Sequence, residues 1–538
     1  MKVEATTQSR LEEEIAVLRD HRQKWLEVGT SRRVLYVETC RQALRRLSSR
    51  WANTAALAKG LAEDSPLVGE EWMLGPLIVA RGLRLLERAL LARGRPFPVY
   101  IHRRIDGTDI VRVFPDGLLE TALWLGMSAD VWVRGKTTQG REYQASFEVE
   151  PRVSLVLGAG NVSSIAATDM LHKLFVENQV VLLKMNPVNE YLGPILEEVF
   201  YPLIRDGFLR IVYGGADIGQ AACAHPDIDT IHITGSEHTF AAIHSAVDKP
   251  VTAELGCVSP VLVVPGPWSA REVKFQATHL AGIMAMNAGC NCVAPQVIVM
   301  ARGWSQREAF LGALRKAISE LPQREAYYPG ATQRREKFLA TYPQAVSEYA
   351  PWTFIPDVDP DAQPMVLKEE AFCGLLAEVS LKTESPDDFL DQAVDFVNQK
   401  VWGNLSATML IHTQTERAFE RVFHRALANL RYGTIGVNLW PGVGFGLMGP
   451  PWGAYPDNTV EDIQSGLGHV HNLYFLDHPE KTVLRGPFTT PYVPPWFPNN
   501  PKLVKTAQAL THFELEPSLA NLFRVHRAIL RQTLARKQ

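Results

Sequence analysis

The chain has 538 residues, more than one hydrophobic core usually holds, so we expect two or three domains. Hydrophobic residues make up 46% of it and charged residues 21%, which is typical of a soluble globular protein. The formal net charge of −3 excludes a general electrostatic attraction to nucleic acid or to an anionic membrane, and we expect neither as a partner.

Two features of the sequence bear on the compartment. No apolar run approaches the roughly 20 residues that cross a bilayer, and MKVEATTQSRLEEEIAVLRD carries charges where a signal peptide has its apolar core. The cysteines are scattered and form no disulfide framework, which fits a reducing compartment. We therefore expect a cytoplasmic protein. The six cysteines are Cys40, Cys223, Cys257, Cys290, Cys292 and Cys373.

The N-terminal part predicts helices followed by strands. Residues 10–95 carry apolar residues at three- and four-residue steps, as in SRRVLYVETCRQALRRLSSRWANTAALAKGLA, and GRPFP ends this stretch. Residues 97–150 are more typical of strands. Within them, ADVWVRGKTTQGREYQASFEVE predicts a β-hairpin, because polar turn residues separate two alternating runs.

An alternation of strands and helices follows from VSLVLGAG onward. Short apolar strands, such as VVLLKMN and DTIHITGS, alternate with helices such as VSSIAATDMLHKLFVEN and LGPILEEVFYPLIRDG. This alternation predicts a parallel sheet that is covered on both faces. Ligands of such sheets bind at the carboxyl ends of the strands, which here are residues 158–161, 184–187 and 234–236.

A second α/β region begins near residue 261. SPVLVVPG is a predicted strand, REVKFQATHLAGIMAMNAG a helix, and CVAPQVIVMA a strand that leaves a loop with two cysteines. Farther on, PFTTPYVPPWFPNNPK is proline-rich and predicts an extended segment, and the C-terminal residues predict one or two helices. The predicted fold class is therefore α/β.

The loop with two cysteines, NAGCNCVAPQ, allows four interpretations. A zinc site needs four ligands, and no second pair follows Cys290 and Cys292, so we expect no metal. A disulfide between residues two apart strains the backbone, which disfavours it. A buried inert pair and a nucleophilic thiol both remain open. A loop between a helix and a strand offers the exposure and the amide donors that a nucleophile needs.

Four other positions each have a functional and a structural interpretation. Glu254, in VTAELGCVSP, ends a strand, where partial burial would tune it to activate water, or it is a surface or cap glutamate. Asn161 closes GAGN, a weak dinucleotide pattern without the third glycine, or is an N-cap. Lys184 ends VVLLK and either reaches a nucleotide or snorkels to solvent. Ser236 begins a helix whose N-terminus can hold an anion, or is a plain cap.

In this order, the segments resemble the NAD(P)-dependent aldehyde dehydrogenase superfamily from about Val153 to Gly468. The similarity rests on six ordered motifs, and VWGNLSATMLI, IGVN, PPWGA and SGLG then follow in the family order. The six are the turn that ends at Asn161, Lys184 at a strand end, HPDIDTIHITGS at 225–236, AELGCVSP with Glu254, NAGCNC with Cys292, and EEAF at 369–372.

The resemblance implies a role for each position. Cys292 would be the catalytic nucleophile, Glu254 the base that activates water, and Asn161 an oxyanion donor. Cys290 takes the family's glutamine position and would be a bystander or a redox partner of Cys292. The residues implied to bind the cofactor, NAD or NADP, are Lys184, Asn186, Gly215, Thr234, Gly235, Ser236, Leu255, Glu370 and Phe372.

The resemblance also implies an architecture, with two Rossmann-type parallel-sheet domains and a β-arm for oligomerisation. The arm would complete a partner's sheet in a homodimer or homotetramer. The expected parts are an N-terminal helical region that leads into the cofactor domain (1–127), the hairpin arm (128–150), the NAD(P)-binding domain (151–256), the catalytic thiol domain (257–455), and the rest of the arm with a C-terminal extension (456–538).

The implied reaction is the NAD(P)-dependent oxidation of an aldehyde to a carboxylic acid, through a thiohemiacetal and a thioester on Cys292. Glu254 favours hydrolysis of the thioester, because a CoA-acylating enzyme does not need that base. A CoA-acylating aldehyde dehydrogenase, or fatty acyl-CoA reductase, and a non-catalytic scaffold are the alternatives. Pro187 replaces a glutamate that would repel a 2′-phosphate, so we expect tolerance of NADP. LWPGVGFGLMGPPWG favours an apolar aldehyde.

The sequence departs from the family pattern at several positions. Ala159 and Gly160 stand where the family has Pro-Trp, and Cys257 stands where it has a glycine. The arginine usual after the nucleophile motif is missing, with Gln296 and Val297 nearby. These departures indicate a divergent member and leave the substrate class open.

Overall fold

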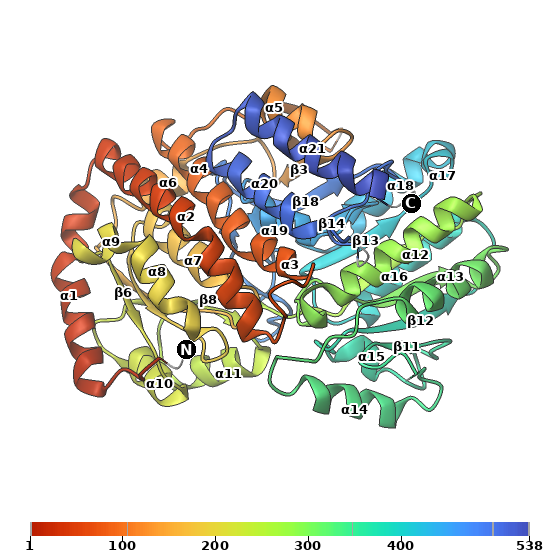
Figure 1. Cartoon of the computed structure of the whole chain (residues 1–538), viewed down its shortest axis with the longest axis horizontal. Helices are drawn as coiled ribbons and strands as arrows, with labels where there is room; N and C mark the ends of the chain where they lie inside the picture. Colours follow the sequence, from red (N-terminus) through yellow and green to blue (C-terminus); the bar gives the residue numbers. More distant parts are fainter. Residues whose placement is uncertain (1–2, 105, 347, 498–499, 536–538) are drawn as a thin grey trace.

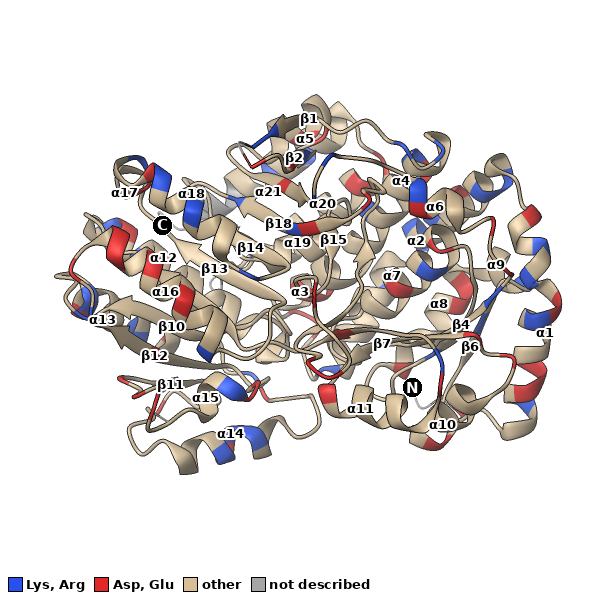
Figure 2. Ribbon diagram, turned by 180° about the vertical axis from the view of Figure 1, so that it is seen from behind, with Lys and Arg blue, Asp and Glu red and all other residues tan. Residues whose placement is uncertain are grey.

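The computed structural model describes residues 3–535 except 105, 347 and 498–499. Two sheets form two lobes, and helices from both ends of the chain lie along them (Figure 1). Lys, Arg, Asp and Glu fall mainly on the helices and loops, whereas the parallel strands at the centre of each sheet carry few of them (Figure 2). Among the described residues, no helix combines the length and the apolar composition that a bilayer crossing demands.

The predicted N-terminal helices are confirmed, and they pack on the first lobe. Trp25 and Trp51 are fully buried, and the Trp25 indole N–H donates to the Leu174 carbonyl at 2.9 Å. These contacts fix the helices against the sheet of the first lobe, because α1 packs on its strands. The helices are α1 (Gln8–Glu27), α2 (Thr30–Ala58), α3 (Val68–Trp72) and α4 (Ile78–Leu91).

The first lobe contains the predicted parallel sheet, in the order β16-β8-β7-β4-β5-β6. Only the short β16 runs antiparallel to its neighbour. The strands are β4 (Val153–Leu157), β5 (Val180–Lys184), β6 (Leu209–Val212), β7 (Thr230–Gly235), β8 (Val251–Leu255) and β16 (Gly466–Leu467). The crossover helices are α7 (Ile165–Leu171), α8 (Gly193–Val199), α9 (Tyr201–Arg205), α10 (Ala216–Ala224) and α11 (Glu237–Ala246).

The second lobe has a ten-stranded sheet, in the order β1-β2-β3-β18-β14-β13-β9-β10-β12-β11. The part from β18 to β11 is parallel, and β1 to β3 extend it in antiparallel fashion. The strands are β1 (Tyr100–Arg103), β2 (Asp109–Phe114), β3 (Ser128–Val133), β9 (Ser259–Val263), β10 (Pro295–Ala301), β11 (Thr353–Ile355), β12 (Leu375–Leu381), β13 (Ser406–Leu410), β14 (Thr434–Val437) and β18 (Pro479–Arg485). The longest helices of this lobe are α12 (Ala270–Ala285), α13 (Arg307–Ser319), α14 (Ala331–Thr341) and α16 (Pro386–Lys400).

The hairpin predicted at 128–150 is wrong in its second half. β3 forms its first strand, but α6 (Arg141–Ala145) stands where the second strand was expected. Two features favour this helix: Gly140 adopts φ 72°, and the Asp477 carboxylate, distant in the chain, accepts the backbone N–H groups of Arg141 and Glu142 at 3.1 and 3.3 Å. A carboxylate on the free N–H groups of a first turn stabilises a helix.

The strands expected to complete a partner's sheet instead complete a sheet of their own chain. β18 pairs with β14 on one side and with β3 on the other, so the segments from 128–133 and 479–485 join the second lobe of the same molecule. The register runs from Ser128↔Arg485 to Val133↔Pro479. This sheet therefore needs no strand from a second copy between β14 and β3.

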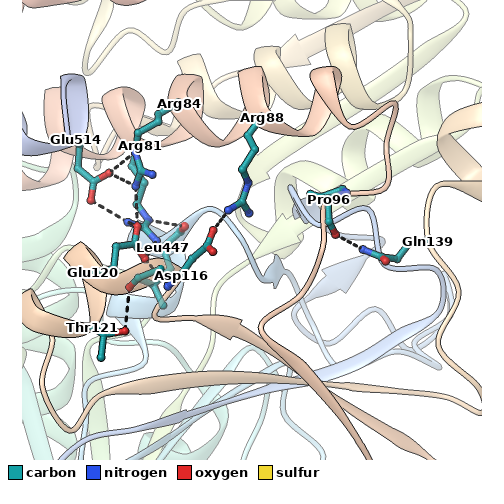
Figure 3. Close-up of polar contacts among 11 residues, drawn as sticks. Arg81, Arg84, Arg88, Pro96, Asp116, Glu120, Thr121, Gln139, Leu447 and Glu514 are labelled. Carbon is teal, nitrogen blue, oxygen red and sulfur yellow. Dashed lines mark hydrogen bonds and ion pairs between the residues drawn. The ribbon is translucent and has the colours of Figure 1, made fainter. Parts of the chain in front are cut away.

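The C-terminal helices α20 (Leu503–Leu515) and α21 (Leu519–Ala535) return to the N-terminal helices and to α5 (Gly117–Leu123). A buried cluster of charges holds this junction together (Figure 3). Arg81 and Arg84 of α4 each bind both Glu120 of α5 and Glu514 of α20, at 2.5 to 2.8 Å. The C-terminal extension is thereby fixed to α4.

Candidate active site

One cavity of about 1330 Å³ is lined by residues of both lobes. All twelve residues that the sequence singled out line it, although they come from segments far apart in the chain. Parallel α/β sheets bind ligands at the carboxyl ends of their strands, and the cavity lies at that edge of the first sheet. The twelve are Asn161, Lys184, Asn186, Gly215, Thr234, Gly235, Ser236, Glu254, Leu255, Cys292, Glu370 and Phe372.

The loop that carries Cys290 and Cys292 is a tight turn between α12 and β10. Asn287 and Ala288 adopt φ 56° and 59°, and Gly289 adopts φ 73°. A Cβ on Gly289 would lie 2.1 Å from the Gly374 backbone nitrogen, so only glycine fits there. This turn brings the half-buried Cys292 to the cavity wall.

The two thiols of this loop have different surroundings. The Cys290 thiol is buried and lies 3.6 Å from the Phe372 carbonyl and 3.8 Å from the Ala288 carbonyl, and burial raises its pKa to about 11. Burial raises the pKa of Cys292 well above its ordinary value, and the carboxyls of Glu370 and Glu254 raise it further. Cys292 lines the cavity and Cys290 does not. A redox role for Cys290 stays a prediction.

Glu254 is the penultimate residue of β8, and its side chain is buried against the cavity. One carboxyl oxygen, Oε1, is buried and has no hydrogen-bond partner in the described part of the chain. Burial raises its pKa well above the ordinary value, Asp169 raises it further, and the Trp452 side chain opposes the rise. A carboxyl with a raised pKa and a free oxygen at a cavity wall can take a proton from water.

Asn161 follows β4 and directs its side-chain amide toward the loop that carries Cys290 and Cys292. Its Nδ2 donates to the Cys290 carbonyl at 3.2 Å, a bond that joins the end of the first sheet to the loop of the second lobe. The second N–H of this amide stays available, because an amide nitrogen carries two donors. Asn161 therefore lies where it can donate to an oxygen bound beside Cys292.

Glu370 and Phe372 also line the cavity. Glu370 accepts the Cys257 backbone N–H at 3.3 Å, and burial raises its pKa to about 7. A Cβ on Gly256 would lie 2.1 Å from a Glu370 carboxyl oxygen, so glycine at 256 leaves room for this carboxyl. Phe372 adopts φ 46° and packs edge-on against Tyr328 at 5.0 Å.

The strand ends of the first lobe supply groups that fit a dinucleotide. The Lys184 ammonium makes no hydrogen bond or ion pair with another residue of the described chain, and burial lowers its pKa. Ser236 caps α11 by accepting the Thr239 N–H at 3.2 Å, so its cap role is confirmed while it also lines the cavity. A free cation, a helix N-terminus and the Glu370 carboxyl match phosphate and ribose chemistry.

Sequence reasoning missed two features of the site. The first is the part of the apolar wall outside LWPGVGFGLMGPPWG, namely Leu74, Trp402 and Leu405. Within LWPGVGFGLMGPPWG, the Trp440 indole donates to the Val293 carbonyl at 3.1 Å. The second is Lys59, whose ammonium contacts Asn161 and, in the loop that carries Cys292, Asn287. No group of three His, Cys, Asp or Glu among the described residues could hold a metal. The apolar wall comprises Leu74, Trp402, Leu405, Trp440, Phe445 and Trp452.

Comparison with known proteins agrees with this geometry. Residues 159–336 match the model of the aldehyde dehydrogenase family. Betaine aldehyde dehydrogenase 2 of Rhizobium meliloti (strain 1021) is 26% identical over 317 residues, 53% of this chain and 58% of the relative. The chain spans less than two thirds of the length of the curated relatives that it matches, with shares of 14% to 36% for others.

Solved structures match over most of the chain. Aldehyde dehydrogenase C of Pseudomonas syringae, a mutant with NAD⁺ and octanal, superposes with a TM-score of 0.62 at 16% identity, over 89% of each chain. NADP-dependent glyceraldehyde-3-phosphate dehydrogenase of Bacillus halodurans C-125, with NADP, gives 0.63 at 18%, over 90% of this chain and 92% of that one. At this identity the likeness concerns the fold. Residues 159–336 therefore match the aldehyde dehydrogenase family, and the chain as a whole shares the fold of the solved aldehyde dehydrogenases.

Proposed function

We propose that this protein oxidises an aldehyde to a carboxylic acid with NAD or NADP as acceptor. The observation that carries the proposal is the cavity itself. The proposal is supported by its lining, which includes the Cys292 thiol, the Glu254 carboxyl of raised pKa, and strand ends that suit a dinucleotide. The family match of residues 159–336 supports the same reaction.

The Cys292 thiolate attacks the carbonyl carbon of the aldehyde and forms a thiohemiacetal. The oxygen that becomes negative is held by the Asn161 side-chain amide and the Cys292 backbone N–H, and losing one such donor costs about 10²–10³ in rate. NAD or NADP, which Lys184 and Glu370 would hold, would supply the hydride acceptor for this carbon, and loss of the hydride would leave a thioester on Cys292.

Hydrolysis of the thioester depends on Glu254. Its ionised carboxylate takes a proton from a water molecule, and the hydroxide attacks the thioester carbon. The acid then leaves, and the Cys292 thiolate is restored. Because the pKa of Glu254 is raised, we expect the hydrolytic step to accelerate with rising pH.

The cofactor and the substrate follow from the two ends of the cavity. Pro187, an exposed residue after β5, replaces the glutamate that would repel a 2′-phosphate, so we propose that NADP is tolerated. The aromatic wall around Cys292 favours an apolar aldehyde. Lys184 and Glu370 would hold the nucleotide, by charge and by hydrogen bonds to the ribose hydroxyls respectively.

The test is the formation of NADH or NADPH from hexanal or benzaldehyde, with and without CoA. Three proteins are compared: the parent, Cys292→Ala and Glu254→Gln. We expect turnover without CoA that is lost in both variants. Turnover that requires CoA and survives Glu254→Gln would overturn the proposal in favour of a CoA-acylating enzyme. The ratio of kcat/KM for NADP and NAD tests the cofactor statement, which a strong preference for NAD would contradict.

A further inference from the structure

A buried lysine of the N-terminal helices reaches the loop that carries Cys292. Lys59 follows the last residue of α2 and has 1% of its side chain exposed. Its ammonium donates to the backbone carbonyl of Asn161 at 3.0 Å and to Oδ1 of Asn287 at 2.9 Å. It also contacts both carboxylate oxygens of Glu71 at 3.0 Å. One cation therefore joins three segments that are distant in the chain.

The acceptors of Lys59 are the groups that fix the geometry beside Cys292. The Asn161 carbonyl accepts from Asn287 Nδ2 at 3.1 Å and from the Tyr327 hydroxyl at 2.9 Å, in addition to Lys59. The Cys290 carbonyl accepts from Asn161 Nδ2 at 3.2 Å and from Asn287 Nδ2 at 2.9 Å. The two asparagines thus hold each other and the carbonyl two residues before Cys292.

The loop needs such support because its backbone is strained. Asn287 and Ala288 both have backbone angles in the left-handed region, which residues other than glycine rarely adopt. Glu70 adds a further tie, since its carboxylate accepts the Asn287 backbone N–H at 3.1 Å and the Arg324 guanidinium at 2.6 Å. The strained residues are therefore held by both backbone and side-chain bonds, from two residues of the N-terminal region.

We propose that Lys59 is a positioning residue for the oxyanion site of this protein. It holds Asn161 and the turn at Asn287 in place, so that the Asn161 amide and the Cys292 N–H converge on the substrate oxygen. The N-terminal helices are then part of the catalytic machinery. This inference rests on the proposed function for its kinetic consequence, but the positioning itself can be measured without turnover.

A simpler role for Lys59 is the neutralisation of Glu71. The two roles separate in a pair of variants. Lys59→Met leaves the buried Glu71 carboxylate without its close cation, because Arg324 lies 4.0 Å away, whereas Lys59→Met/Glu71→Leu removes both charges. If Lys59 only neutralises Glu71, the double variant restores activity. If Lys59 positions the loop, the double variant recovers thermal stability but not kcat.

A matched control is Lys481→Met. Lys481 is equally buried, and its ammonium caps the end of α18 (Glu420–Asn429) through the carbonyls of Leu427, Ala428 and Leu430 at 2.7 to 3.2 Å. It does not line the cavity. Far-UV circular dichroism sets a temperature at which all variants are folded. There, kcat, the KM of hexanal and of the cofactor, and hydrogen–deuterium exchange of residues 286–293 are measured.

We expect kcat to fall about a hundredfold in Lys59→Met and in the double variant, as a displacement of about 1 Å does in other enzymes. The cofactor KM stays within threefold of the parent, and exchange at 286–293 accelerates in both. Lys481→Met keeps the parent kcat and exchange. Recovery of kcat to within threefold of the parent in the double variant, or unchanged exchange at 286–293, would overturn the positioning role. A parent that oxidises no aldehyde would refute the proposed function, and the exchange measurement would still decide the role of Lys59.

Discussion

Two buried charge clusters brace the N-terminal helices, and they differ in what they touch. The junction cluster, made of Arg81, Arg84, Glu120 and Glu514, is almost entirely charge on charge, with the Leu447 carbonyl as an added acceptor of Arg81. The loop cluster has the same composition of two cations and two carboxylates, and its bonds continue onto the amides beside Cys292. The loop cluster comprises Lys59, Glu70, Glu71 and Arg324.

The surroundings of the cations differ in the same sense. Burial lowers the pKa of Arg81, but Glu120 and Glu514 outweigh burial and raise it above the ordinary value. Burial lowers the pKa of Lys59, and Glu71 offsets only part of this effect. Most acceptors of Arg81 are therefore carboxylate oxygens, whereas half of the contacts of Lys59 are with neutral oxygens. The same charge composition therefore serves stability in the junction cluster and the geometry of the loop that carries Cys292 in the loop cluster.

The largest effect is expected from Glu514→Leu in the junction cluster. The variant leaves Arg81 and Arg84 with one buried carboxylate, and breaking a buried pair costs about 3–5 kcal/mol of unfolding free energy. The kcat of the folded protein stays within twofold of the parent, because Glu514 lies outside the cavity. Thermal unfolding and kcat with hexanal are the measurements. A tenfold loss of kcat at full folding would erase the contrast between the clusters.

A smaller effect is expected from Tyr327→Phe, which changes a neighbour of the loop cluster that shares the Asn161 carbonyl with Lys59. The change removes one of three donors to the Asn161 carbonyl and leaves Lys59 in place. A net hydrogen bond of about 1 kcal/mol corresponds to roughly a fivefold loss of kcat. Steady-state kinetics at saturating cofactor measures it. A loss as large as that of Lys59→Met would show that the Tyr327 hydroxyl is needed as much as the lysine.

The next effect concerns the Glu254 carboxyl, which forms no ion pair with another of the described residues. Arg81 and Arg84 overcome burial and lower the pKa of Glu120, whereas burial and Asp169 raise that of Glu254. Asp169→Asn removes the like charge, so the pKa of Glu254 falls and its base form persists to lower pH. The acid limb of the kcat–pH profile therefore moves to lower pH. An unmoved or opposite limb would separate Asp169 from the base.

Salt is expected to have the smallest effect. Raising the ionic strength from about 0.1 to 1 M shortens the screening length from about 10 to 3 Å, but it screens buried pairs much less than exposed ones. Both clusters lie out of solvent, with Arg84 the most exposed member at 18% of its side chain. Neither the kcat nor the unfolding temperature should respond strongly. A salt-dependent kcat with constant KM would indicate that water reaches Lys59.

The sequence predicts the strands and much of the site because those signals are local. Cys292, Glu254 and Lys184 each close a short apolar run or follow a glycine turn, and parallel topology then brings strand ends together. The helix at Arg141–Ala145 escaped prediction, because the Asp477 carboxylate that caps it is more than 300 residues away in the chain. The same limit applies to β3 and β18, whose pairing no local pattern reveals.

Lys59 shows the limit most clearly. Its contacts with Asn161 and Asn287 span 102 and 228 positions. In the sequence, it is an ordinary lysine at the end of a helical stretch, AALAKG, where a solvated side chain is the usual expectation. Its burial comes from the packing of α2 and α3 against the loop, a tertiary effect that helical periodicity does not encode.

In the proposed mechanism, Cys292 carries the acyl group and Glu254 releases it. The direct test is rapid mixing of Glu254→Gln with cofactor and hexanal, followed by mass spectrometry of the peptide that contains both Cys290 and Cys292. We predict a burst of one reduced cofactor per site, little further turnover, and a hexanoyl group on Cys292. Continued turnover without the adduct, or an adduct on Cys290, would contradict it.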